Sequence, residues 1–222
     1  MAEQLILDLP IRTALGRDDF FVSSANAVAV AGIDGWQDWP HGKMVLAGPE
    51  ASGKTHLAHV WAAMTGAEVI EGASVAGLTP EAPGPMLVVE DADRLEGEAA
   101  ETALFHLHNA VVGQGGRLLL TARLAPARWP VTLPDLKSRI QQAGVLQLDA
   151  PDDALLAAVM VKLAADRQLA LGPDLMSYAL LRMERSFAAA RRLIEAIDAR
   201  ALRDKTRPTK PMIATLLAEM AD

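Results

Sequence analysis

Between an apolar run and a helix-like segment the sequence reads Gly48-Pro49-Glu50-Ala51-Ser52-Gly53-Lys54-Thr55. This stretch matches the pattern G-x-x-x-x-G-K-[ST], whose glycines let backbone N–H groups turn toward phosphate oxygens. A helix beginning near Lys54 would point the positive end of its dipole at the same place. We therefore expect a phosphate-binding loop, with Lys54 reaching the β- and γ-phosphates of a nucleotide and Thr55 holding Mg²⁺. The alternative, an ordinary glycine-rich turn, is disfavoured by the strand–loop–helix context.

A second polar element ends another apolar run, Met86-Leu87-Val88-Val89-Glu90-Asp91. An apolar strand that ends in acids is typical of a Walker B element. Its first acid, here Glu90, helps to position Mg²⁺, and its second, here Asp91, orients an attacking water. The first acid is usually Asp, so the longer Glu90 alters the geometry available to Mg²⁺. A solvated strand end within an acidic stretch is the alternative interpretation.

Apolar runs of strand length alternate with helix-length segments through the first two thirds of the chain. The expected strands are 43–47, 67–70, 85–89, 117–121 and 144–148, and the expected helices are 55–64, 98–112 and 133–142. Most of these runs are continuously apolar, which is typical of strands buried on both faces. Such an alternation predicts a parallel sheet with helices on both faces.

After Pro151 the strand signals stop. Helical spacing of apolar residues continues through four segments, 152–167, 173–183, 187–203 and 211–220. We therefore expect an α/β fold, with a P-loop parallel-sheet base over residues 18–150 and a small all-helical domain over residues 151–222. Residues 1–17 would form a separate N-terminal segment.

Composition narrows the functional classes. The 222 residues suffice for a sizeable core, and the net charge of −7 argues against a general polyanion binder. Even so, residues 182–210 carry nine bases against four acids. This basic stretch is either a solvated helix face or a surface that faces a nucleotide or a partner. The absence of cysteine excludes disulfides, Cys-ligated metals and a thiol nucleophile, and it fits a cytoplasmic protein. No apolar run approaches membrane-spanning length, so we expect no membrane association.

With these motifs in place, the sequence resembles the DnaA family of AAA+ proteins, and within it the short DnaA-related regulators. Three segments carry the resemblance: Asp18-Asp19-Phe20-Phe21-Val22-Ser23-Ser24-Ala25-Asn26, Gly53-Lys54-Thr55-His56-Leu57 and Leu133-Pro134-Asp135-Leu136-Lys137-Ser138-Arg139. The first implies that Phe20 borders the adenine of bound ADP or ATP, and the second adds His56 to the nucleotide loop. The third implies that Arg139 acts on a nucleotide held by a neighbouring molecule. The helices after Pro151 would then form the AAA+ lid. A surface ion pair of Arg139 with Asp135 or Asp149 is the alternative.

The sequence departs from the family pattern at three places. Glu90 is the first. The second follows the strand that ends at Thr121, where Ala122-Arg123 replaces a small residue and Asp. The third is Ala188, which occupies the place of a lid arginine, with Arg185, Arg191 and Arg192 nearby. Each departure weakens the case for efficient hydrolysis by this chain alone.

The N-terminus reads Gln4-Leu5-Ile6-Leu7-Asp8-Leu9, in which Leu5, Leu7 and Leu9 alternate as in an extended strand. An edge strand or frayed terminus would account for this pattern. The family resemblance instead implies a peptide that docks on the replication sliding clamp, the beta subunit of DNA polymerase III. Gln4 would be the amide anchor, and the three leucines would fill an apolar groove.

These features lead us to expect a regulatory adaptor. It would bind ADP or ATP with Mg²⁺, dock on the DNA-loaded clamp and present Arg139 to the ATP of the initiator DnaA. The sequence ends at Asp222 without a helix-turn-helix domain, which favours a regulator over an initiator. Contact with DNA would be mainly indirect, and the chain could also form a homodimer. A self-sufficient P-loop ATPase, acting as a loader or remodeller, is the second hypothesis, and a small-molecule nucleotide kinase is the third.

Overall fold

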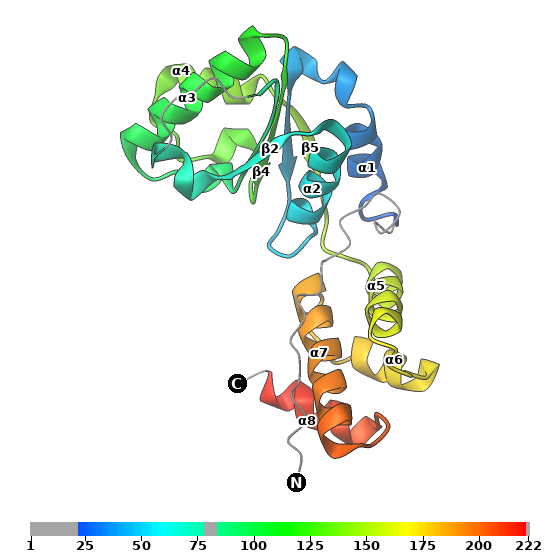
Figure 1. Cartoon of the computed structure of the whole chain (residues 1–222). Coiled ribbons are helices and arrows are strands. Elements are labelled where there is room, and N and C mark those ends of the chain that lie inside the picture. The colour runs from blue at the N-terminus through cyan, green and yellow to red at the C-terminus, as the bar shows by residue number, and fades with distance from the viewer. Residues whose placement is uncertain (1–21, 78–83, 221–222) are drawn as a thin grey trace, which may run out of the picture.

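The chain forms a sheet-centred base and a separate cluster of helices, which we call the lid (Figure 1). The computed structural model describes residues 22–77 and 84–220. The strands of the base are β1 (Lys43–Ala47), β2 (Glu68–Glu71), β3 (Met86–Glu90), β4 (Arg117–Ala122) and β5 (Gly144–Gln147). They pair in parallel in the order β2-β3-β4-β1-β5. The parallel sheet predicted from the alternating pattern is therefore confirmed.

Burial follows the position of each strand in the sheet. Every residue of β1 is buried, and in β4 only the first residue is not. The edge strands β2 and β5 are partly exposed along their length. The inner strands β1 and β4 are therefore almost completely buried. The edge strands are more exposed because each has a neighbouring strand on one side only.

Helices cover both faces of the sheet (Figure 1). The helices α1 (Ala27–Asp34) and α2 (Lys54–Thr65) pack on one face, and α3 (Gly97–Gly113) and α4 (Pro134–Gln141) pack on the other. Short 3₁₀ helices connect these elements: Trp36–Asp38, Pro40–Gly42, Gly72–Gly77, Ala92–Arg94 and Pro126–Arg128. Successive strand residues point to opposite faces, so Val45 joins the core under α3 while Leu46 joins the core under α2. Each such buried aliphatic side chain contributes about 1.5–3 kcal/mol.

The strand order brings three functional segments together. Because β4 lies between β1 and β3, the carboxyl ends of these three strands meet at one edge of the sheet, which we call the carboxyl edge. The loop 48–53 leaves this edge from β1, Glu90 ends β3, and Ala122 ends β4. In open parallel sheets, ligands bind outside the carboxyl ends of the strands.

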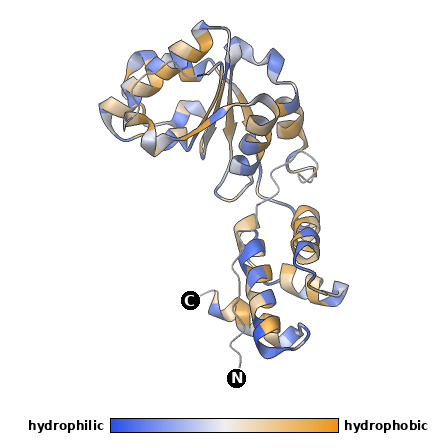
Figure 2. Ribbon diagram, viewed as in Figure 1, coloured by the Kyte–Doolittle hydropathy of each residue, from blue (hydrophilic) through white to orange (hydrophobic). Residues whose placement is uncertain are grey.

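The lid consists of α5 (Asp153–Asp166), α6 (Pro173–Leu180), α7 (Phe187–Asp204) and α8 (Lys210–Glu219). Its own core includes Leu156, Leu193, Ile194, Ile197 and Ile213, and Figure 2 shows that the lid helices contain both hydrophobic and hydrophilic residues. Three helices begin with side-chain caps, in which Asp152, Ser186 and Thr209 accept from backbone N–H groups of α5, α7 and α8.

All expected strands and helices are present, with ends that differ by up to three residues. Helix α1 was not assigned from the sequence, although its residues Ala29 and Ile33 are fully buried. Four predicted clamp-binding residues, Gln4, Leu5, Leu7 and Leu9, and the predicted adenine neighbour Phe20 lie outside the described residues. Within the described part of the chain, no helix is long and apolar enough to cross a membrane.

Candidate nucleotide-binding site

The loop between β1 and α2 turns sharply at two places. Gly53 has φ +96° and Ala51 has φ +59°, both in the left-handed region. A Cβ atom added to Gly48 would lie 2.5 Å from the carbonyl oxygen of Leu148, so no larger residue fits there without a shift. The glycines predicted for a phosphate loop therefore meet two separate requirements, positive φ at Gly53 and close backbone approach at Gly48.

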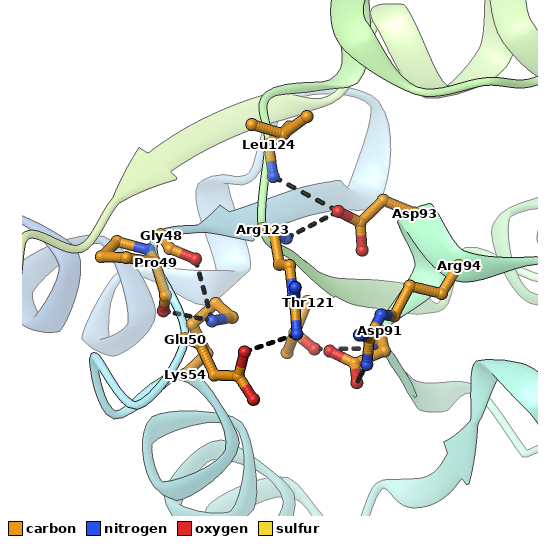
Figure 3. Close-up of polar contacts among 10 residues, drawn as sticks. All are labelled: Gly48, Pro49, Glu50, Lys54, Asp91, Asp93, Arg94, Thr121, Arg123 and Leu124. Carbon is orange, nitrogen blue, oxygen red and sulfur yellow. Dashed lines mark hydrogen bonds and ion pairs between the residues drawn. The ribbon is translucent and has the colours of Figure 1, made fainter. Parts of the chain in front are cut away.

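Lys54 is the buried cation of this loop. The residue is 7% exposed, and Nζ donates to the carbonyl oxygens of Gly48 (2.9 Å) and Pro49 (2.7 Å) (Figure 3). Desolvation lowers the pKa of Lys54, while the carboxylates of Asp91 and Asp93 oppose that effect. The ammonium is therefore held in the loop, with acidic groups beside it.

Among residues 22–77 and 84–220, three buried polar atoms at the carboxyl edge have no hydrogen-bond partner: Ser52 Oγ, Glu90 Oε1 and Asp93 Oδ1. Buried polar groups are nearly always satisfied, so each of these atoms marks a place where a ligand or water belongs. A hydroxyl fits a phosphate oxygen, and carboxylate oxygens fit Mg²⁺ or its water shell. The donor set present therefore fits a magnesium-bound nucleotide.

The two predicted Walker B acids face different surroundings. Glu90 Oε2 lies 3.7 Å from His59 Nε2 of α2, and its side chain is mostly buried. Asp91 has φ +49° and is exposed, and its Oδ2 lies 3.5 Å from Arg94 Nη1. Both acids lie at the same edge of the sheet as Lys54. Among the described residues, no group of three or more His, Cys, Asp or Glu side chains is placed to hold a metal ion. Mg²⁺ would therefore depend on phosphate oxygens in addition to Glu90 and the exposed Thr55.

Asp93 was not singled out from the sequence. Its Oδ2 accepts from the backbone N–H groups of Arg123 (2.8 Å) and Leu124 (3.4 Å), which follow β4 (Figure 3). The hydroxyl of Thr121 accepts from the N–H of Asp91 at 3.0 Å. These contacts connect the segment after β3 with the segment after β4. The only feature of the sequence that could have indicated this role of Asp93 is its position two residues after Asp91.

The lid meets the phosphate loop through its longest helix. A Cβ added to Gly53 would lie 3.2 Å from the Phe187 ring, so the first residue of α7 packs against the loop. The predicted lid arginine position, Ala188, is exposed. Of the substitutes considered, Arg185 lies 2.8 Å from Asp153 and Arg192 lies 3.9 Å from Glu184. These two guanidinium groups are therefore engaged within the lid.

Arg139 lies in the last turn of α4 and is exposed. In the described parts of the chain it forms no ion pair, so the alternative pairs with Asp135 and Asp149 are not observed. Burial and then the charge of Arg139 lower the pKa of Lys43 to about 8. Nζ of Lys43 lies 3.1 Å from Nε2 of His108, whose pKa is also lowered, chiefly by burial. Arg139 is therefore near the amino-terminal end of β1, whereas the phosphate loop follows the other end.

A buried carboxylate fixes the start of α4. Glu101 of α3 accepts from the N–H and hydroxyl of Thr132 and from the N–H of Leu133, at 2.7–3.1 Å. The N-cap residue of α4, Leu133, has no side chain that could accept from the N–H groups of the first turn, and it is Glu101 that holds the residues at which the helix starts. Burial raises the pKa of Glu101, but these hydrogen bonds outweigh it and bring the pKa below its usual value. Glu101 thus anchors the helix that carries Arg139.

Comparisons with known proteins agree with this architecture. No protein-family model matches the chain. Over 118 residues it is 27% identical to an uncharacterized protein of Haemophilus influenzae, and over 117 residues it is 28% identical to the chromosomal replication initiator protein DnaA of Desulfotalea psychrophila. These matches span about half of this chain (53% and 52%), but 51% and 24% of the relatives' lengths.

Solved structures extend the likeness in fold to nearly the whole chain. Domain III of DnaA from Thermotoga maritima has a TM-score of 0.83 at 16% identity, covering 95% of this chain and 98% of that chain. AMPPCP-bound DnaA from Aquifex aeolicus has a TM-score of 0.71 at 15% identity, covering 84% and 66%. The chain therefore has the fold of domain III of the replication initiator DnaA.

Replacing Glu101 with Gln tests how α4 is anchored. At pH 7 we expect the free energy of unfolding to fall by about 1–3 kcal/mol, because an amide accepts fewer of these hydrogen bonds. A carboxylate whose pKa is depressed by folding stabilises above its unfolded pKa and loses that effect as pH falls. The difference from wild type should therefore shrink below about pH 4.5. Urea denaturation across pH measures both effects.

Glu68→Gln provides the control, since Glu68 is exposed on the edge strand β2. Its effect should stay within about 0.5 kcal/mol. A Glu101→Gln protein as stable as wild type at pH 7 would contradict the anchoring role.

Proposed function

We propose that the carboxyl edge of the sheet binds an adenine nucleotide, ADP or ATP, with Mg²⁺. The observation that carries this proposal is a buried lysine in a phosphate-type loop beside three buried polar atoms that have no partner in the described part of the chain. Lys54 and Ser52 would donate to phosphate oxygens. Thr55 and Glu90 would hold Mg²⁺, which neutralises phosphate charge when bound. The AMPPCP-bound relative supports a nucleotide as ligand, and the resemblance of residues 18–26 supports adenine.

We further propose that the chain regulates the initiation of chromosome replication, as does the short DnaA-related regulator Hda, which it resembles. It docks on the sliding clamp through Gln4, Leu5, Leu7 and Leu9 and promotes hydrolysis of ATP bound to DnaA. The DnaA-like fold and the match to a DnaA sequence support a place in replication initiation. The clamp and DnaA are partners that the family resemblance supplies.

Arg139 is suited to act on a neighbour's nucleotide and not on its own. It lies near Lys43 at the amino-terminal end of β1, one strand length from the phosphate loop. Five strand residues span roughly 16 Å, which is farther than an arginine side chain reaches. A guanidinium there is always charged and can donate two hydrogen bonds to phosphate oxygens as their charge develops. Exclusion of water at a closed interface would strengthen these bonds.

A self-sufficient ATPase is the second candidate. It is favoured by one observation, the guanidinium of Arg123 close to Lys54 in the same chain. Turnover by the purified protein separates the two candidates. A regulator should be nearly inert until clamp and DnaA are added, whereas a self-sufficient ATPase turns over alone.

Lys54→Ala should weaken ADP and ATP binding at least 100-fold, because it removes a charge-assisted contact to the phosphates. Isothermal titration calorimetry measures this change. Lys210→Ala, at an exposed lid position, is the matched control and should bind like wild type. Unchanged affinity in the Lys54 variant would refute nucleotide binding at this loop.

Replacing Gln4 and Leu7 together with Ala should abolish clamp binding in a pull-down assay. The amide anchor and a groove-filling side chain would both be lost. Nucleotide affinity should stay the same, because the phosphate loop is a separate segment. Equal clamp binding by this variant and wild type would rule out the proposed peptide.

Arg139→Ala should fold, bind nucleotide and bind clamp, yet fail to stimulate ATP hydrolysis by DnaA. Arginine fingers in GTPases change rates by roughly 10³–10⁵, so even a weak one is measurable. The assay is single-turnover hydrolysis by DnaA with DNA-loaded clamp. Arg139→Lys should recover only part of the rate because Lys lacks the planar fork. Full stimulation by Arg139→Ala would place the finger elsewhere or exclude the regulator.

A further inference from the structure

A cluster of basic residues lies at the end of the lid that is farthest from the base (Figure 1). It consists of Arg203 near the end of α7, Lys205 and Arg207 in the connection that follows, and Lys210 at the start of α8, and we call it the basic tip. All four residues are exposed, and the only acid within residues 203–210 is Asp204. The basic tip is therefore a local positive patch on a chain whose net charge is −7.

Most of this charge is not neutralised within the lid. Arg203 Nε lies 3.1 Å from Asp204 Oδ1, but Lys205, Arg207 and Lys210 form no ion pair with any residue in 22–77 or 84–220. Other lid arginines do have acidic partners in the same chain: Arg167 pairs with Glu195, Arg185 with Asp153 and Arg200 with Glu219. Three cations of the basic tip are thus available to an anionic partner.

Lys210 is placed where its charge does not favour the helix that it begins. The amino-terminal end of a helix carries a partial positive charge, so a cation there is unfavourable and an acid is preferred. The first turn of α8 contains no acid. The positive end of α8 therefore adds to the charge of the basic tip, which suits an anion outside it.

The backbone of the basic tip is fixed by hydrogen bonds at both helix ends. Lys205 ends α7 with φ +50°, and its N–H donates to the carbonyl oxygens of Ala201 and Leu202. Thr209 Oγ1 accepts from the N–H of Met212 at 3.4 Å and so caps α8. The positions of the cations are therefore set by the fold, and no change of the backbone is needed to present them to a partner.

The basic tip is too far from the phosphate loop to bind the chain's own nucleotide. Helix α7 begins at Phe187, which packs against Gly53 of the loop, and it contains 18 residues. At 1.5 Å per residue the helix is roughly 27 Å long. This length exceeds the reach of any side chain, so the anion that fits the basic tip belongs to a partner.

Duplex DNA has the charge that the basic tip fits. Its two strands carry one negative charge per ~1.7 Å of helix axis, and flexible Lys and Arg side chains bind such phosphates without a preformed pocket. The base disfavours the same contact, because residues 68–101 hold nine acids against one base. A membrane surface fits less well. Membrane-bound helices also present a large apolar face to lipid, and Leu202 is the one exposed large hydrophobic residue of α7 and α8.

We infer that the basic tip of the lid binds the phosphate backbone of duplex DNA without reading its sequence. This direct contact is additional to the contact with DNA that the proposed docking on a DNA-loaded clamp provides. It involves neither Lys54 nor Gln4, so it does not depend on nucleotide or clamp binding. On a DNA-loaded clamp, the tip would hold the lid against the duplex and limit the orientations of the chain.

The DNA affinity of the full-length chain tests the inference. Fluorescence anisotropy with labelled duplexes of two unrelated sequences should give equal binding, with a Kd of roughly 1–100 µM near physiological salt. Replacing Lys205, Arg207 and Lys210 together with Ala should weaken binding at least tenfold at about 50 mM salt, because three phosphate contacts are lost. The slope of log affinity against log salt should become less steep by about 2.7, since each contact contributes about 0.9.

An equal change of charge elsewhere is the matched control. Arg128, Lys137 and Arg182 are exposed and lie outside the basic tip, and replacing all three with Ala should change DNA affinity less than about threefold. The basic-tip variant should unfold at the same temperature as wild type, because its three altered side chains form no ion pair in the described chain. It should also bind ADP and clamp as wild type does.

Absence of DNA binding by wild type, or equal losses in the basic-tip and control variants, would overturn the inference. So would tip-dependent binding to phosphatidylglycerol vesicles that is tighter than binding to the duplex, since the tip would then belong to a membrane-facing surface. A preference of more than about tenfold for one duplex sequence would contradict binding through phosphates alone. Failure of the proposed function is a separate outcome, because Lys54→Ala and the Gln4 and Leu7 double variant should bind free DNA like wild type.

Discussion

Burial of the Lys54 ammonium at the carboxyl edge of the sheet is the constraint on which the site depends. A buried cation must be hydrogen-bonded and neutralised, since desolvating a charge is costly. Two loop carbonyls accept from Nζ, and the charges of Asp91 and Asp93 oppose the lowering of its pKa by burial. The loop must therefore fold back over the start of α2, which requires the left-handed conformation of Gly53. In the proposed nucleotide complex, phosphate oxygens of the ligand would replace these carbonyls as partners of Nζ.

The two ends of the parallel strands carry opposite chemistry. The carboxyl edge gathers the acids after β3 around the lysine of the loop. At the amino edge, Lys43, His108 and Arg139 lie together, and Arg139 has no ion pair in the described residues. A contact that brings one molecule's amino edge to another molecule's carboxyl edge is head-to-tail. The proposed action of Arg139 on a neighbour's nucleotide would require such a contact, and therefore a second molecule.

The lid and base are joined close to the same site. Phe187 packs against Gly53, and Asp152 at the start of α5 accepts from Ser24 Oγ at 3.3 Å. The N–H of Asp149 also donates to the carbonyl of Ala25. Ser24 and Ala25, which belong to the segment 18–26 that the family resemblance assigns to adenine, therefore contact the base–lid connection. A change in the conformation of the phosphate loop would act directly on α7, because Phe187, the first residue of that helix, contacts the loop.

By itself, the sequence determined the strands, most of the helices and the loop, although α1 was not assigned from it. Continuous apolar runs, helical spacing and the glycine pattern are local signals, so strands, lid helices and the loop around Lys54 were predictable to within a few residues. It also marked Arg123 as a departure from the family pattern. Only the tertiary structure decided what Arg123 contacts, because Glu50 lies 73 residues away and Asp93 lies 30 residues away. The anchoring of α4 by Glu101, across 31 residues, was likewise unpredictable. Such contacts depend on strand order and helix packing, which bring together side chains that no sequence spacing relates.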